Sequence, residues 1–266
     1  SAIFHVAAKA GIWGDRQDYW ASNVQATDNL LSACREYEIT RFVFTSSPSV
    51  AQTDEGCSGG TEAMPIPSEH RTYYQASKAL SEKRVLEAYC ESLRTVALRP
   101  RLVWGPGDPH LLPRLVARAK QGRLALVGRG DALIDSSYID NVVDAHLAAA
   151  DALDELPSPC VGKAYFISNG EPRAMGTLIN QLLETAGAPQ VRKRIPVWLA
   201  VILGRVLESV WSLFRLGGEP PMTRFLAYQL STPNWYDLGA ARRDLGYHPR
   251  ISLDEGLARL TAEQDP

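Results

Sequence analysis

The sequence predicts an α/β fold, a doubly wound parallel sheet with a smaller, mainly helical part formed late in the chain. Short β-like runs alternate with helical patterns through the first half of the 266 residues. Strands that alternate with helices of this length are typical of right-handed β-α-β units. After residue 170 the patterns are mostly helical, and we find no internal repeat.

The expected elements follow one another along the chain. Strand-like runs cover AIFHVAA (2–8), RFVFTSS (41–47), TVALRP (95–100) and AYFISNG (164–170). Helical spacing of apolar residues covers 23–37, 74–90, 115–122, 174–186, 198–216, 237–246 and 252–260, and SYIDNVVDAHLAAAD (137–151) is a strand end that runs into a helix. Ser252 and Glu255 have the spacing of a capping box, which predicts the start of the last helix.

The composition is ordinary for a soluble protein and excludes some partners. Hydrophobic residues make up 45% of the chain, charged residues 22%, and the formal net charge is -2. Without a basic surface, binding to nucleic acid is not expected. The four cysteines are scattered and form no ligand pattern with the histidines, so we expect reduced thiols and no metal. No secretory signal opens the chain, which favours a cytoplasmic protein.

The stretch RTYYQASKAL (71–80) carries the chemistry. Tyr74 and Lys78 are four residues apart, so a helix places them on one face. A nearby ammonium favours the phenolate, and such a tyrosine can deliver or remove the proton when a ketone and an alcohol interconvert by hydride transfer. Ser47 ends the preceding strand, at the sheet edge where ligands bind in open α/β folds. The alternative is a surface lysine beside a half-buried tyrosine, with Ser47 as a cap or turn hydroxyl.

Longer strings carry a resemblance over nearly the whole chain. They are FHVAA (4–8), Asn23-Val24 before a helix, FVFTSSPSV (42–50), YQASK (74–78), LRPRLVWGPGD (98–108), YIDNVVDAHL (138–147), AYFISNGEP (164–172) and RRDLGYHP (242–249). Together they resemble the extended short-chain dehydrogenases/reductases, which have a Rossmann-like fold, and within them the 3β-hydroxysteroid dehydrogenase group. Two branches are most similar, the 2-alkyl-3-oxoalkanoate reductases and the sterol-4-carboxylate 3-dehydrogenases, and FHVAAKAGIWG with SSPSV favours the first.

The resemblance assigns roles to individual residues. It implies Tyr74 as acid and base, Lys78 as the ligand of the nicotinamide ribose that also lowers the pKa of Tyr74, and Ser47 as the partner of the substrate oxygen. Asn23 would support the helix and a water chain near the site. The implied cofactor is NAD or NADP, bound by Ala7, Ala8, Lys9, Thr45, Ser46, Tyr74, Lys78, Pro100, Leu102 and Val103. A homodimer paired through the helices over 23–37 and 74–90 is also implied.

The same resemblance predicts the domain organisation. Residues 1–105 and 136–170 would form the dinucleotide-binding, Rossmann-like domain, and 106–135 with 171–266 the substrate-binding part. The family pattern begins with a strand and a Gly-rich turn that sets the pyrophosphate on a helix N-terminus, so roughly 65 to 75 residues would precede Ser1 and leave this domain incomplete at its N-terminus. The acid that selects NAD or NADP would lie in that expected segment.

Two rival functions share the fold. Dehydratases of sugar nucleotides usually have Asp-Glu after the strand-end hydroxyl, where this chain has Ser47-Pro48, and epimerases tend to have Asn at the position of Leu102. A non-catalytic NAD(P)-binding regulatory protein would not need a proton relay of Tyr74 and Lys78. The sequence therefore favours an NAD(P)-dependent oxidoreductase acting on a lipophilic 3-oxo or 3-hydroxy acid, or on a 3β-hydroxysteroid.

WLAVILGRVLESVWSLFRL (198–216) is the most apolar segment, and Arg205, Glu208 and Arg215 interrupt it. It fits a buried core helix, a lipid-facing surface helix or a lid over an apolar pocket. The lipid-facing reading predicts peripheral membrane association through 198–216.

The remaining polar candidates favour structural roles. Arg101 is either a carboxylate partner or a surface arginine, and the second is preferred. His110 and His146 lack neighbours at metal-ligand spacing. Asp140 and Asp144, one helical turn apart, are expected to cap a helix or to tie the two parts of the molecule together.

Overall fold

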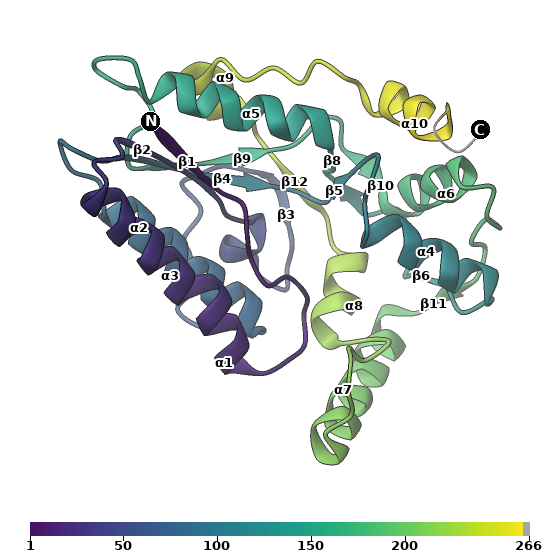
Figure 1. Ribbon diagram of the computed structural model, residues 1–266. Coiled ribbons are helices and arrows are strands. Elements are labelled where there is room, and N and C mark those ends of the chain that lie inside the picture. The colour runs from purple at the N-terminus through teal and green to yellow at the C-terminus, as the bar shows by residue number, and fades with distance from the viewer. Residues whose placement is uncertain (263–266) are drawn as a thin grey trace.

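The computed structural model describes residues 1–262 as a parallel sheet between helices, with a second group of elements beside it (Figure 1). The strands are β1 (Ala2–His5), β2 (Arg41–Thr45), β3 (Cys57–Gly60), β4 (Arg94–Pro100), β5 (Val103–Trp104), β6 (Leu126–Val127), β7 (Leu133–Ile134), β8 (Ser137–Tyr138), β9 (Lys163–Ile167), β10 (Arg173–Ala174), β11 (Arg194–Ile195) and β12 (Asn234–Tyr236). The α-helices are α1 (Arg16–Tyr19), α2 (Ala26–Glu36), α3 (Tyr73–Glu87), α4 (Leu111–Lys120), α5 (Ile139–Ala152), α6 (Met175–Thr185), α7 (Val197–Phe214), α8 (Arg224–Ser231), α9 (Gly239–Leu245) and α10 (Leu253–Ala262). A π-helical turn covers Trp20–Gln25, and a 3₁₀ turn covers Pro48–Ala51.

The central sheet has the order β1-β2-β4-β9, and all of its pairs are parallel. Successive side chains of a strand point to opposite faces, so Phe42 and Phe44 of β2 pack with α2 and α3 while Val43 packs with α5. The pair α2 and α3 therefore covers one face and α5 with α9 covers the other (Figure 1). The predicted doubly wound α/β fold is confirmed.

A second core lies beside the sheet and joins α4, α6 and α10. The parallel pair β5–β8 brings Trp104 next to Tyr138, with ring centroids 5.4 Å apart. A Cβ built on Gly256 of α10 would lie 2.6 Å from the Tyr138 ring, so this helix packs directly on the aromatic pair. The loops that end β4 and β9 therefore lead from the sheet into this second core.

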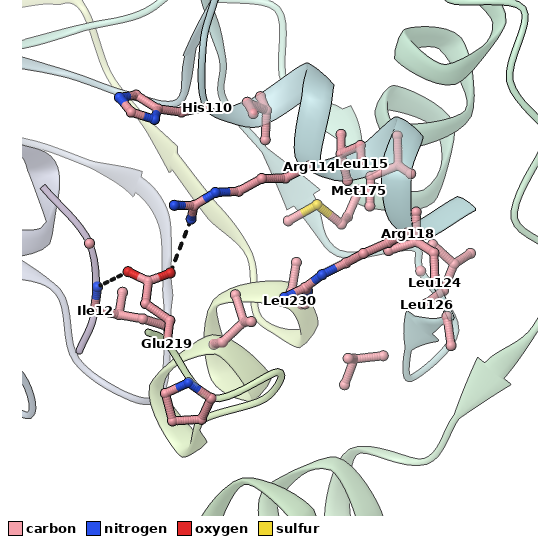
Figure 2. Close-up of a pocket in the computed structure, with 18 residues that line it drawn as sticks. Ile12, His110, Arg114, Leu115, Arg118, Leu124, Leu126, Met175, Glu219 and Leu230 are labelled. Carbon is pink, nitrogen blue, oxygen red and sulfur yellow. Dashed lines mark hydrogen bonds and ion pairs between the residues drawn. The ribbon is translucent and has the colours of Figure 1, made fainter. Parts of the chain in front are cut away.

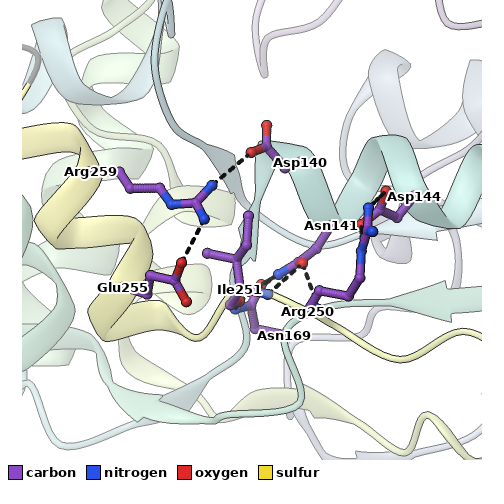
Figure 3. Close-up of polar contacts among 8 residues, drawn as sticks. All are labelled: Asp140, Asn141, Asp144, Asn169, Arg250, Ile251, Glu255 and Arg259. Atoms are coloured by element: carbon purple, nitrogen blue, oxygen red, sulfur yellow. Dashed lines mark hydrogen bonds and ion pairs between the residues drawn. The ribbon is translucent and has the colours of Figure 1, made fainter.

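Asp140 and Asp144 of α5 hold the C-terminal segment (Figure 3). Asp140 pairs with Arg259 of α10 at 3.4 Å, and Asp144 accepts from Arg250 Nε at 2.8 Å. Between them, the Asn141 side-chain oxygen accepts from the Arg250 N–H at 3.0 Å. The two aspartates thus tie distant parts of the chain together, as expected, and are not a paired-carboxylate site.

The apolar segment around 198–216 is not a core helix, which corrects one of the three sequence readings. In α7 only Ala200 and Gly204 are buried, whereas Trp198 and Phe214 are 64% and 66% exposed. α7 extends away from the rest of the molecule (Figure 1). Within residues 1–262 it is the one helix whose length and composition would suffice to cross a membrane. A surface helix or a lid remains, because Val197, Ala200 and Val201 join a small cluster with β6 and α8 while the large side chains of Trp198 and Phe214 stay exposed.

Candidate active site

Helix α3 places Tyr74 and Lys78 against the sheet. The helix begins after Thr72, whose hydroxyl accepts a backbone hydrogen bond of 3.1 Å and caps it. Tyr74, Lys78 and Glu82 follow at intervals of four residues, and Lys78 and Glu82 are 2% and 0% exposed. Tyr73 points outward and is 49% exposed. The helical spacing therefore distinguishes the two adjacent phenols as the sequence analysis expected.

The end of β2 contacts the face of α3 that carries Tyr74 and Lys78. The hydroxyls of Tyr74 and Ser47 share a hydrogen bond, and Lys78 Nζ donates to the Thr45 carbonyl at 2.5 Å. Four residues of helix rise about 6 Å and two residues of strand about 6.6 Å, so the two contacts stay in register. Ser47 also hydrogen-bonds Ser49 of the following 3₁₀ turn at 2.9 Å. The structure thus brings together the three residues that the sequence nominated for catalysis.

Burial controls the protonation of both groups. Burial raises the pKa of Tyr74, and the hydrogen bond with Ser47 opposes that rise. Burial lowers the pKa of Lys78 to about 8, although the nearby Glu82 carboxylate raises it. Lys78 is not among the groups that shift the pKa of Tyr74 here, and its ammonium donates to the Thr45 carbonyl. The effect of Lys78 on the phenol stays a prediction.

Asn23 fixes the loop that follows β1. Its side-chain oxygen accepts from the Lys9 N–H at 2.7 Å, and its amide nitrogen donates to the Lys9 carbonyl at 3.1 Å and to Ser77 Oγ at 2.9 Å. Its backbone carbonyl accepts from Thr27 and Ser81 hydroxyls at 2.6 and 3.0 Å. These contacts coincide with the π-helical turn, a feature often found at functional sites. The sequence predicted a helix that starts at Asn23. In the structure the helical segment begins earlier, at α1, and takes the wider π-helical form around Asn23.

The expected cofactor residues lie at the carboxyl ends of three neighbouring strands. Ala7 and Ala8 are exposed just after β1, Thr45 and Ser46 end β2, and Pro100 ends β4. The carboxyl edge of a parallel sheet is where ligands bind in this class of fold.

The residues after Pro100 connect this edge to the second core. Leu102 has φ +40°, a conformation that costs an L-residue about 1–2 kcal/mol and that Asn tolerates better. Its side chain packs against the second core, which explains why an apolar residue is kept there. Val103 pairs with Ser137 in β5–β8. Arg101 is not a surface arginine: burial lowers its pKa, and it donates to Gln229 at 3.1 Å.

Three observations at this edge fit a nicotinamide cofactor. Lys78 is buried yet forms no ion pair within residues 1–262, and its ammonium has three donors, of which the Thr45 carbonyl takes one. The Ser46 hydroxyl is buried without a hydrogen-bond partner in the part of the chain that is described. Ala7 and Ala8 add only methyl groups, which leaves their backbone open to a ligand. Free donors and open backbone are what ribose and carboxamide groups require.

Sequence reasoning missed the residues that hold α3 in place. Arg99 of β4 donates to both oxygens of Glu82, at 2.9 and 2.5 Å. The interval of four residues that singled out Lys78 extends to Glu82 and could have identified it. No local signal marks Ser77 as the partner of Asn23. His146 supports the strand end through Thr45 Oγ1 at 2.7 Å, and the described residues hold no cluster that could bind a metal.

Comparisons with known proteins agree with this geometry. The 3-beta hydroxysteroid dehydrogenase/isomerase family matches residues 1–197. The 2-alkyl-3-oxoalkanoate reductase of Stenotrophomonas maltophilia is 52% identical over 98% of this chain and 79% of its own length. The decarboxylating sterol-4-alpha-carboxylate 3-dehydrogenase erg26 of Schizosaccharomyces pombe is 34% identical over 94% and 74% of the two chains. Among solved structures, the epimerase Mth375 of Methanothermobacter thermautotrophicus aligns with a TM-score of 0.75 at 19% identity, covering 98% of this chain and 70% of that one.

At 19% identity the epimerase shares the fold alone. The sequence relatives are named as a reductase and a dehydrogenase, which confirms the expected oxidoreductase class. With the family pattern covering residues 1–197, the chain belongs to the 3-beta hydroxysteroid dehydrogenase/isomerase family.

Proposed function

We propose that the protein interconverts the 3-oxo and 3-hydroxy groups of a long-chain 2-alkyl acid, with NAD or NADP as cofactor. The hydrogen bond between Tyr74 and Ser47, next to buried Lys78, is the observation that carries this proposal. The 52% identity to a 2-alkyl-3-oxoalkanoate reductase, against 34% to the sterol dehydrogenase, favours the acid over a sterol.

The side chains act on the substrate oxygen. When bound, the nicotinamide supplies or accepts the hydride. Ser47 donates a hydrogen bond that positions the carbonyl oxygen, and Tyr74 delivers its proton to that oxygen during reduction. Because burial raises the pKa of Tyr74, the phenol keeps its proton at neutral pH and is ready as an acid.

Lys78 has the position of a cofactor ligand. Its unused donors would bind the ribose hydroxyls of the nicotinamide half, close to the phenol. Asn23 would keep the Ala7–Lys9 backbone in place along the cofactor. In this proposal residues 1–105 and 136–170 bind the dinucleotide, and 106–135 with 171–266 bind the substrate.

Two alternatives remain as outcomes of a test. A sugar-nucleotide epimerase or dehydratase would act on a polar substrate, whereas the two sequence relatives are named for a 2-alkyl-3-oxoalkanoate and a sterol. A regulatory NAD(P)-binding protein would show cofactor binding without turnover. We would follow the oxidation of NADH and NADPH with 2-alkyl-3-oxoalkanoates, and the reduction of NAD and NADP with 3β-hydroxysterol-4-carboxylates. Conversion of UDP-glucose would be followed by analysis of the sugar product, because epimerases and dehydratases return the hydride to the substrate and leave NAD unchanged overall. Turnover of the 2-alkyl-3-oxoalkanoate alone is expected; turnover of UDP-glucose would refute the proposal.

We also propose that α7 contacts a membrane surface. Trp198, Ile202, Val206, Leu213 and Phe214 of α7 are each more than half exposed. Cations precede, interrupt and follow this apolar sequence in a chain whose net charge is -2, namely Arg192, Lys193, Arg194, Arg205 and Arg215. Apolar residues flanked by cations are typical of interfacial helices on anionic lipid. This contact would give a cytoplasmic protein access to lipophilic substrates.

A homodimer through α2 and α3 is the second proposed partnership. Tyr37, Tyr73 and Tyr89 lie on or beside the ends of these helices and are 69%, 49% and 51% exposed. Tyrosine is enriched in protein interfaces. Sedimentation should show a dimer that Tyr37→Glu weakens; an unchanged monomer would refute it.

A further inference from the structure

A cavity of about 340 Å³ lies between α4, α6, α8 and β6 (Figure 2). Its volume is at the lower end of the range for small-molecule sites. The apolar lining consists of Ile12, Leu111, Leu115, Leu124, Ala125, Leu126, Val127, Met175, Ile179, Pro220, Leu226 and Leu230. Such a lining binds hydrocarbon and offers little to a sugar or a phosphate.

The two arginines of α4 that line the cavity, Arg114 and Arg118, differ in their partners. Arg114 pairs with Glu219 at 3.0 Å, and the same carboxylate accepts from the Ile12 N–H at 3.1 Å. The guanidinium of Arg118, one turn further along α4, has no hydrogen-bond or ion-pair partner within residues 1–262. Figure 2 shows Arg118 extending from α4 into the cavity. Its methylene stem covers apolar surface while the guanidinium occupies space that a ligand could take.

The loop after β1 lines both this cavity and a polar cavity at the start of α3. A Cβ built on Gly11 would lie 2.5 Å from Glu219 Oε1 and 3.4 Å from the Tyr19 hydroxyl. Gly11 also has φ +106°, so both the space and the backbone conformation at this position require glycine. Burial raises the pKa of Tyr19, and the nearby Glu219 and Tyr74 side chains add to that rise. Ile12 lines both this cavity and the larger polar cavity that reaches Thr72, two residues before Tyr74.

We propose that this cavity binds one hydrocarbon chain of the substrate and that Arg118 sets the length of the chain it accepts. The inference rests on the proposed function, because a 2-alkyl-3-oxo acid has two chains that leave the reacting carbon region in different directions. One chain passes Ile12 into the cavity. Arg118 limits the space at the α4 side, and the Glu219 bridge keeps the Gly11–Ile12 turn at the mouth.

The test measures chain length by binding and by turnover. Calorimetric titration of the protein with saturated fatty acids of six to sixteen carbons should show affinity rising up to about fourfold per methylene, then a plateau once the cavity is full. Ala125→Phe fills the cavity and should move the plateau to shorter chains. Ala117→Phe is the matched control, because Ala117 is an exposed residue of α4 outside the lining. Arg118→Ala should move the plateau to longer chains.

The two readouts separate the failure of this inference from that of the proposed function. The same shifts are expected in kcat/KM for 3-oxo acids of graded length. Absence of turnover with intact chain-length shifts in titration would refute the proposed function and keep the cavity assignment. Equal plateaus in Ala125→Phe and Ala117→Phe, with both variants folded by circular dichroism, would overturn the inference. If Ala125→Phe does not fold, an unchanged plateau in Arg118→Ala overturns it.

Discussion

The ammonium of Lys78 donates a hydrogen bond to the backbone carbonyl of Thr45, 2.5 Å away. This bond attaches the middle of α3 to the last residue of β2, where the strand turns into Ser46 and Ser47. Because Tyr74 meets Ser47 one helical turn earlier, helix and strand end form one unit. Lys78 thus holds α3 against the end of β2, in addition to the role we propose for it in binding the cofactor.

Replacing Tyr74 by Phe should reduce kcat by about 10²–10⁴-fold, because the proton donor is lost while the ring still packs. Tyr73→Phe is the matched control, since Tyr73 is the exposed neighbour on the same helix. Steady-state kinetics of both variants give the comparison, with cofactor affinity measured by fluorescence titration. Equal activity in the two variants would exclude the phenol at 74 as the acid.

Replacing Asn23 by Ala should release the loop after β1. The Lys9 backbone would lose both bonds to the amide, and Ser77 its partner, at a cost of about 1–3 kcal/mol for buried polar groups left unpaired. Hydrogen exchange at residues 7–14 should accelerate, and KM for the cofactor should rise. Asn29→Ala, at an exposed site on α2, should change neither quantity. If residues 7–14 still exchange slowly in Asn23→Ala, the Asn23 side chain does not hold this loop in place.

Lys78 should titrate far below other lysines. Burial lowers its pKa to about 8 from 10.5, so the unfolded chain binds the proton more tightly than the folded one between these values. Stability should therefore rise with pH from about 8 to 10.5 through this group, since the cost of burying the lysine is full below pH 8 and falls to zero as the pH approaches 10.5. NMR of ¹³C-methylated lysines should show one resonance near pH 8 that disappears in Lys78→Met. Titration of every lysine near 10.5 would argue against this burial.

Glu38→Gly should stabilise the protein by about 1 kcal/mol, because Glu38 has φ +52° directly after α2 and glycine adopts that conformation without strain. Glu36→Gly, two residues earlier at the last residue of α2, should destabilise it by up to about 1 kcal/mol. Both side chains are exposed, so packing contributes little to either change. Thermal unfolding should shift in opposite directions; shifts of the same sign would disprove the assigned helix end.

Binding to vesicles tests the membrane contact of α7. The protein should sediment with vesicles containing phosphatidylserine, and less with neutral ones, because the cations around α7 favour anionic lipid. Ile202→Glu should weaken binding, whereas Leu147→Glu on α5, also an exposed apolar site, should not. If both variants bind equally, or if Ile202→Glu instead dissolves a dimer, α7 serves another partner.

The sequence by itself determined the fold class, and it predicted the members of the candidate site. Period-two and period-3.6 patterns depend on local geometry, so the four strands of the central sheet and α3 could be recognised from the residues alone. The interval from Tyr74 to Lys78 likewise selects one phenol of two, because a helix has the same pitch wherever it lies.

Only the tertiary structure decided what these groups contact. Arg99 and Glu82 are 17 residues apart, and Asn23 and Ser77 are 54 apart, so no local pattern reveals either pair. The pKa values of Tyr74 and Lys78 follow from burial, which the packing of α3 on β2 creates. The exposure of α7 could not be predicted from its composition, because an apolar helix can have the same sequence whether protein or lipid surrounds it. Periodicity is a property of the chain, whereas burial is a property of how its elements meet.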